Sequence, residues 1–351
     1  MLRSGTPDGY SVRTKHAARA LPILKNSGFI MHDISESAVD LLSSGYPTIV
    51  RVPGSSASER FAWIAAHKAE LAERLVRVGA MRFCDLCADT PELFETLSQV
   101  FFEEAAGYVG GDSPRTRVSS RVYTSTEYPP TQAISLHNEM SFAATWPAQL
   151  LFGCIVPAQQ GGATPIADSR AILQALDRSI VEEFTARGVS YIRNLPGGSG
   201  FGRSWQQTFE TDDRAAVERY CRETGSEFEW KADGGLRLIQ RRPAVAVHPL
   251  TGESVWFNQA DQYHPSTHPP AVYEALVGVY GDDPADLPSN ATFGDGGPLP
   301  TEMLTTIRQT IAQLTVAFPW ERGDALWLDN MLACHGRQPF SGPRRILVSM
   351  A

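Results

Sequence analysis

Ala133-Ile-Ser-Leu-His137-Asn-Glu139-Met-Ser-Phe142 is the stretch on which the predicted fold and site depend. An apolar run leads into a histidine, and a carboxylate follows two residues later. Side chains alternate along an extended strand with a period of two, so His137 and Glu139 are expected on the same face. An imidazole and a carboxylate on one face supply two ligands of a 2-His-1-carboxylate metal triad.

This pair is weak evidence by itself. With 8 histidines and 39 acidic residues in a chain of 351, one His-x-Asp/Glu pair is expected by chance. The alternative interpretation is a strand histidine that simply hydrogen-bonds to a nearby carboxylate. The metal-site interpretation therefore depends on what the rest of the chain adds.

The C-terminal segment adds a second histidine and an arginine. A predicted strand begins at Gly323-Asp and ends at Asp329-Asn330, and His335 follows it. The chain then returns through Arg344-Arg345 into a last apolar strand. If His335 is the third ligand, Arg345 lies beside the same metal, where its permanent charge suits a carboxylate. The alternative for the two arginines is a surface ion pair.

An iron(II) site of this type needs a cosubstrate that chelates the metal as a 2-oxo acid and carries a second carboxylate. 2-Oxoglutarate has this structure, and Arg345 would bind its distal carboxylate with help from the Thr164 hydroxyl. The expected cofactors are iron(II), 2-oxoglutarate and O₂. The expected metal ligands are His137, Glu139 and His335, with no catalytic residue beyond them.

Four motifs carry a family resemblance. They are His137-Asn-Glu-Met-Ser-Phe, Gly161-Gly-Ala-Thr-Pro-Ile-Ala-Asp-Ser-Arg, Trp256-Phe-Asn-Gln and Leu328-Asp-Asn-Met-Leu-Ala-Cys-His-Gly-Arg. Together they resemble the TauD/TfdA superfamily of Fe(II)/2-oxoglutarate-dependent dioxygenases, and within it the SyrP-like branch. The resemblance runs from about Arg121 to the C-terminus.

The resemblance implies a hydroxylase that acts on an unactivated C–H bond and releases succinate and CO₂. Members of this branch modify an amino acid or an amino-acid-derived substrate, free or tethered to an acyl or peptidyl carrier protein. They do so in peptide natural-product and antibiotic biosynthesis. The implied partners are therefore a small-molecule substrate and, for a tethered substrate, a carrier protein.

Two positions depart from taurine dioxygenase. The carboxylate ligand is Glu139 rather than aspartate, and Ser349 stands where that enzyme has a second arginine near its sulfonate substrate. Sulfonate cleavage is therefore not favoured, and Glu139 fills the position that related halogenases keep free for chloride. The alternatives that stay open are a dioxygenase of another small acid (a sulfonate or an aryloxyacid), a desaturase, and a non-catalytic jelly-roll binding protein.

The expected fold is mainly β with flanking helices (α+β), built as one domain over 1–351 on a double-stranded β-helix, or jelly roll. Residues 1–45 are expected to be an N-terminal arm. The glycine-rich segment 193–210 is a candidate lid loop. Arg193 and Arg203 flank its glycines and are candidates for substrate binding, the alternative being solvated loop charges. Local patterns also predict helices at 58–78, 90–106 and 302–318 and strands at 118–125, 149–156 and 345–350.

Composition excludes some partners. The formal net charge of −8 without a basic stripe argues against nucleic acid. No apolar run is long enough to span a bilayer and the start lacks a signal-peptide pattern, so no membrane association is expected. Five cysteines, an odd number and mostly isolated, are typical of reduced thiols in the cytoplasm. The sequence does not indicate the oligomeric state.

Overall fold

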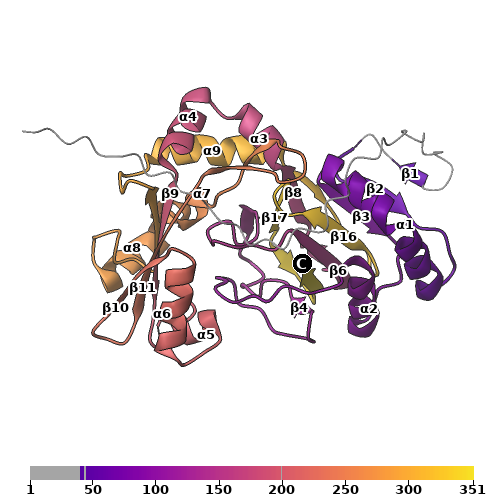
Figure 1. The fold of residues 1–351 in the computed structure, drawn as a ribbon, viewed down its shortest axis with the longest axis horizontal. Coiled ribbons are helices and arrows are strands. Elements are labelled where there is room, and N and C mark those ends of the chain that lie inside the picture. Colours follow the sequence, from indigo (N-terminus) through magenta and orange to yellow (C-terminus); the bar gives the residue numbers. More distant parts are fainter. Residues whose placement is uncertain (1–39, 43–44, 199) are drawn as a thin grey trace, which may run out of the picture. The chain divides into compact units, whose positions relative to one another are not determined.

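The computed structural model describes residues 40–42, 45–198 and 200–351. The predicted N-terminal arm, residues 1–45, lies almost entirely outside these described residues, so that prediction stays untested. The expected mixture of sheets and helices is confirmed (Figure 1). Among the described residues, no helix has the length and apolar character needed to cross a membrane.

A seven-stranded sheet is the largest element. Its strands are, in spatial order, β1 (Asp40–Leu42), β2 (Thr48–Arg51), β3 (Ala80–Cys84), β16 (Ala325–Asp329), β6 (Gln149–Val156), β19 (Arg345–Met350) and β4 (Tyr123–Thr124). Only β2 and β3 pair in parallel, and helix α1 (Ala57–Val78) provides the crossover that parallel neighbours need. The strand predicted at 118–125 is wrong in extent, since only Tyr123–Thr124 pairs with β19.

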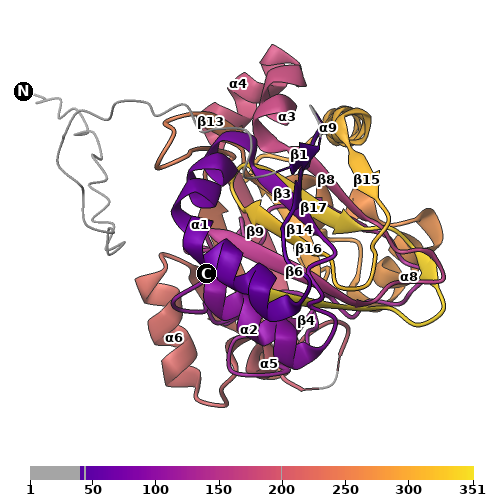
Figure 2. The same cartoon turned by 90° about the vertical axis from the view of Figure 1, so that its right-hand side faces the viewer.

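Helices α1 and α2 (Pro91–Phe101) cover one face of this sheet (Figures 1 and 2). Both begin as the sequence predicts, because the Ser56 and Thr90 side chains accept a backbone N–H from the first turn. Helix α2 ends at Phe101, five residues earlier than expected. Phe102 is extended instead and buries its ring in the core beneath the helices.

A four-stranded sheet faces the other side of the large sheet. Its strands are β15 (Val316–Phe318), β8 (Thr164–Asp168), β17 (Ala333–Arg337) and β5 (Ile134–His137). Phe152, Leu326 and Ile346 of the large sheet share one core cluster with Ile166 and Ala333 of the small one. The candidate site lies between these two sheets.

The helix predicted at 302–318 is too long. Helix α9 (Thr301–Leu314) ends at Leu314. After Thr315 the chain forms β15, Val316–Phe318, which pairs with β8. The β-branched Thr315 and Val316 favour the extended conformation, and from Val316 onward the chain pairs with β8.

A second four-stranded sheet consists of β10 (Glu227–Trp230), β11 (Leu236–Arg242), β9 (Val189–Leu195) and β14 (Ser289–Phe293). Helices α5 (Trp205–Phe209) and α6 (Arg214–Glu223) pack on it through a separate apolar cluster. The remaining elements are α3 (Ser169–Ala175), α4 (Arg178–Arg187), α7 (Ala260–Tyr263), the 3-10 turn η1 (Pro265–Thr267), α8 (Pro270–Tyr280), and the strand pairs β12 (Val245–Val247) with β13 (Ser254–Trp256) and β7 (Gln160–Gly161) with β18 (Phe340–Ser341).

The candidate lid segment, 193–210, is only partly irregular. Strand β9 continues to Leu195 and α5 begins at Trp205, and the described residues of the loop between them, 196–198 and 200–204, belong to neither helix nor strand. Whether this loop acts as a lid stays a prediction.

Candidate metal centre

His137, Glu139 and His335 converge on one buried point. The two histidines lie opposite each other on β5 and β17, with ring centroids 4.5 Å apart. Glu139 Oε2 is 4.0 Å from His137 Nε2 and 3.7 Å from His335 Nε2. One donor atom from each residue lies within 4.8 Å of the other two. The structure thus brings together the three side chains that were expected as metal ligands.

The histidines are prepared to bind a metal through Nε2. His137 Nδ1 lies 2.9 Å from the Ser135 carbonyl oxygen, so this nitrogen donates its proton there and Nε2 keeps its lone pair. Burial, followed by the nearby His137 and Arg115, lowers the pKa of His335 well below its usual value, so its ring is neutral. Two imidazoles and a carboxylate are a donor set that fits iron(II).

Glu139 is held in place by Asn330. The Glu139 N–H donates to Asn330 Oδ1 at 2.7 Å, and Asn330 Nδ2 donates to the Glu139 carbonyl oxygen at 2.9 Å. Strand β5 ends at His137, and Met140 has a φ of 57°, so Glu139 lies in a turn rather than in a strand. The alternation of side chains along a strand correctly predicted that Glu139 lies beside His137. The two hydrogen bonds from Asn330, however, are what hold Glu139 in this position.

The four motifs of the resemblance meet behind the ligands. Asn138 Nδ2 donates to Ser169 Oγ at 3.1 Å and to the Asn330 carbonyl oxygen at 2.7 Å. Gln259 Nε2 donates to the Asn138 carbonyl oxygen at 2.8 Å. Asn138 therefore faces away from the ligands and ties together segments that lie 31 to 192 residues from it in the sequence.

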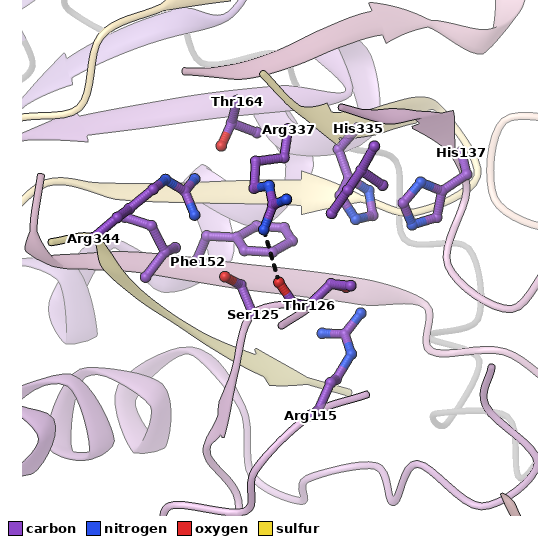
Figure 3. Close-up of a pocket in the computed structure, with 12 residues that line it drawn as sticks. Arg115, Ser125, Thr126, His137, Phe152, Thr164, His335, Arg337 and Arg344 are labelled. Carbon is purple, nitrogen blue, oxygen red and sulfur yellow. Dashed lines mark hydrogen bonds between the residues drawn. The ribbon is translucent and has the colours of Figure 1, made fainter. Parts of the chain in front are cut away.

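The arginine expected beside the metal is Arg344, not Arg345. Arg345 is exposed at the start of β19, whereas Arg344 lines the pocket that also contains His137 and His335 (Figure 3). Side chains alternate along the strand, so Arg344 and Ile346 face the small sheet and Arg345 faces away. Burial and the nearby positive charge of Arg337 lower the pKa of Arg344 to about 10, which leaves it charged at neutral pH.

Thr164 lines the same pocket from β8. Its Oγ1 accepts a hydrogen bond from Trp320 Nε1 at 2.8 Å, which leaves the hydroxyl proton available to a ligand. Ser349 lies on the opposite face of β19, where its Oγ is 2.7 Å from Ser98 Oγ. The position expected for a second arginine is Ser349 when counted from Arg345 and Val348 when counted from Arg344. Neither position holds an arginine.

Arg193 and Arg203 are not among the residues that line this pocket. Arg193 is 1% exposed and donates to the Gly110 carbonyl oxygen and to Asp112 Oδ1, while Arg203 donates to the Ser113 carbonyl oxygen. Both side chains fasten the segment 110–113 and have no contact with the ligands. The expectation that they bind substrate stays a prediction, whereas the alternative of a solvated charge is wrong for Arg193.

Arg115 is a site residue that the sequence did not reveal. Its Nη2 lies 2.5 Å from Glu139 Oε2, and both side chains are almost fully buried. Arg115 belongs to neither a helix nor a strand, so no periodicity indicated which way it points. Its place follows from the tertiary fold alone, because 24 residues separate it from its carboxylate partner.

Comparisons with known proteins identify the family of this chain. Residues 50–351 match the family described as "Taurine catabolism dioxygenase TauD, TfdA family". The dapdiamide synthesis protein DdaC of Enterobacter agglomerans is 35% identical over 309 residues, which cover 88% of this chain and 92% of that protein. A clavaminate synthase-like protein of Arabidopsis thaliana is 32% identical over 298 residues, 82% and 86% of the two chains. The solved structure of PvcB from Pseudomonas aeruginosa aligns with a TM-score of 0.48 and 17% identity over 86% of this chain and 84% of that one.

The fold and the buried His-Glu-His cluster define a metal-dependent oxygenase. The chain belongs to the TauD/TfdA family of dioxygenases. The sequence-based expectation of an enzyme that uses iron(II) and 2-oxoglutarate is confirmed at the level of the family.

Proposed function

We propose that this dioxygenase hydroxylates an unactivated C–H bond of an amino acid or an amino-acid-derived substrate, free or carrier-tethered, in the synthesis of a natural product. His137, Glu139 and His335 are its iron ligands. When bound, iron(II) and 2-oxoglutarate supply the activation of O₂ that hydroxylates the substrate and leaves succinate and CO₂. The observation that carries this proposal is the single buried cluster of three donor atoms.

Arg344 is assigned to the distal carboxylate of 2-oxoglutarate. It lines the same pocket as the ligands, and its Nε donates to the Gly162 carbonyl oxygen at 3.0 Å, which orients the rest of the guanidinium. A guanidinium offers two parallel hydrogen bonds to a carboxylate. The Thr164 hydroxyl, oriented by Trp320, donates one further hydrogen bond to the same carboxylate.

The biosynthetic role is supported by sequence relatedness. DdaC, a relative named for dapdiamide synthesis, aligns over nearly the whole length of both chains. The absence of an arginine at Val348 and Ser349 disfavours a sulfonate substrate. We assign the core to a double-stranded β-helix in a single domain, the seven- and four-stranded sheets being its two walls. The connection between β9 and α5, within the candidate segment 193–210, serves as its lid.

The first experiment removes the carboxylate ligand. Glu139→Ala should weaken the visible charge-transfer band that iron(II) and 2-oxoglutarate give anaerobically and abolish succinate release in air, because the iron loses its carboxylate ligand. An exposed control, Arg345→Gln, should keep both signals. A colourless wild-type mixture without bound iron would instead favour a non-catalytic binding protein.

The second experiment identifies the substrate class. Amino acids, offered free and as carrier thioesters, are compared with sulfonates and aryloxyacids in coupled succinate release. Product mass separates hydroxylation, which adds 16 Da, from desaturation, which removes 2 Da. Turnover confined to sulfonates or aryloxyacids would contradict the proposal.

A further inference from the structure

Arg115 has donors that its contacts do not use. Only Nη2 reaches Glu139, whereas Nε and Nη1 are buried and have no hydrogen-bond partner among the described residues. Buried guanidinium donors of this kind normally have acceptors, because leaving them unpaired costs free energy. The arginine lines the pocket that holds both histidines, so a ligand in this pocket is the acceptor within reach (Figure 3).

The surroundings fix Arg115 rigidly. Its guanidinium carbon lies 4.7 Å from the centre of the Tyr108 ring. The preceding segment, 110–113, is tied down by Arg193 and Arg203. A side chain held on both sides loses little conformational entropy when it binds a ligand. The two free donors are therefore arranged in advance for an acceptor.

The charges of the pocket favour an acceptor with negative character. Arg115, Arg337 and Arg344 all line it. Iron(II) and the 2-oxoglutarate dianion cancel in formal charge, which leaves three guanidiniums against the Glu139 carboxylate. Arg337 is solvated by four backbone carbonyl oxygens at 2.7–3.3 Å, those of Thr126, Tyr128, Pro129 and Gln132. Arg344 is assigned to the cosubstrate, and among the described residues Arg337 keeps one buried donor without a partner, its Nε, against two on Arg115. Arg115 is therefore the guanidinium with more donors left for an acceptor.

We propose that Arg115 anchors the carboxyl group of the substrate beside the iron through Nη1, while Nη2 stays on Glu139. This inference rests on the proposed function and adds a specificity residue to it. The acceptor oxygen belongs to a free carboxylate or to the carbonyl of a thioester. In both cases the substrate is fixed by its carboxyl end, which sets the distance from the iron to the carbon that is oxidised.

The test uses binding rather than turnover. The wild-type protein, loaded anaerobically with iron(II) and 2-oxoglutarate, is titrated with amino acids in three forms: the free acid, the pantetheine thioester and the decarboxylated amine. The charge-transfer band reports binding near the metal. For at least one of the amino acids offered, the free acid or the thioester should shift the band at a concentration about 30-fold lower than the corresponding amine requires. The form that acts at the lower concentration identifies the source of the carboxyl oxygen.

Variants then assign the effect to Arg115. Arg115→Gln should raise the concentration needed by about 30- to 100-fold, while the band without substrate is still formed but shifted, because Glu139 loses its guanidinium partner. Arg115→Lys keeps the charge beside Glu139 but loses the second donor, so it should bind the carboxyl compound less tightly than the wild type and retain the band. If Arg115→Gln fails to fold, the measurement is made on Arg115→Lys alone. Arg345→Gln is the exposed control and should behave as the wild type.

Four results would overturn the inference. The first is an equal shift of the wild-type band by the amine and the acid, and the second is no shift by any carboxyl compound. The third is binding of the carboxyl compound by Arg115→Gln and Arg115→Lys as tightly as by the wild type. Loss of the substrate-free band in both variants would assign Arg115 to the metal or the cosubstrate instead. Failure of the wild type to form this band is a different result, which contradicts the proposed function itself.

Discussion

Arg344 and Arg345 are chain neighbours in opposite environments. Arg344 is partly buried in the pocket, with its Nε on the Gly162 carbonyl oxygen, and Arg345 is exposed. Two adjacent residues have such different environments because only one face of β19 is turned toward the metal ligands.

Replacing each arginine in turn tests this assignment. Arg344→Gln should weaken 2-oxoglutarate binding by about 30- to 100-fold, because a charge-assisted pair worth roughly 2–3 kcal/mol is lost. Arg345→Gln, the matched control, should change it less than twofold. Anaerobic titration of the charge-transfer band measures both. Equal weakening in the two variants would contradict the assignment.

Asp261 gives a pH dependence at the scale of one residue. It is 6% exposed, and burial raises the pKa of its carboxyl from 3.8 to about 6, with Arg308 partly opposing this effect. A pKa that is higher in the folded state favours folding below pH 4, and this contribution is lost as the pH rises through 6. The ionised carboxylate therefore destabilises the protein at neutral pH.

Asp261→Asn should remove this penalty. We expect the free energy of unfolding at pH 8 to rise by on the order of 2 kcal/mol, and the gain to disappear below about pH 4, where the wild-type carboxyl is protonated as well. Urea unfolding at both pH values measures it. A gain of the same size at pH 4 would show that ionisation is not the cause.

At the scale of secondary-structure elements, helix α2 packs closely on the large sheet. Helix α2 lies against β6 at Gly153, where an added Cβ would be 2.2 Å from Phe94 Cδ2. A larger residue cannot be accommodated without moving the helix or the ring. Gly278, in contrast, is exposed in helix α8, and an added Cβ there meets nothing within 4 Å.

Alanine at these two glycines should have opposite effects. Gly153→Ala should lower the free energy of unfolding by about 1–3 kcal/mol through overpacking. Gly278→Ala should raise it by about 0.5–1 kcal/mol, because the helix interior loses a flexible residue. Chemical denaturation of both variants provides the comparison. A neutral Gly153→Ala would mean that α2 does not approach the sheet this closely.

At the scale of the whole molecule, the site joins strands that are distant in the chain. The ligands come from β17 of the small sheet, from the end of β5 and from the turn after it, and Arg344 precedes β19 of the large sheet. A ligand that contacts both sheets should therefore stabilise the entire fold.

Metal and cosubstrate should raise the melting temperature together. At one hundred times the dissociation constant, a ligand adds about 2.7 kcal/mol, which corresponds to roughly 5–10 °C for a large domain. Anaerobic thermal unfolding with iron(II) and 2-oxoglutarate measures the shift. His137→Ala should abolish it, and an unchanged shift in that variant would place the metal elsewhere.

The sequence by itself determined the chemistry of the protein: the three candidate ligands, the cosubstrate class and the family. These depend on residue types and short spacings, which are local properties. Tertiary structure decided which arginine faces the pocket. Strand β19 is buried on both faces after Arg345, so the pattern of apolar residues does not show which face is turned toward the pocket. It alone also brought Arg115 to Glu139 and Asn330 to the turn that holds Glu139. Contacts between such distant segments depend on how the sheets pack, and no local pattern records that packing.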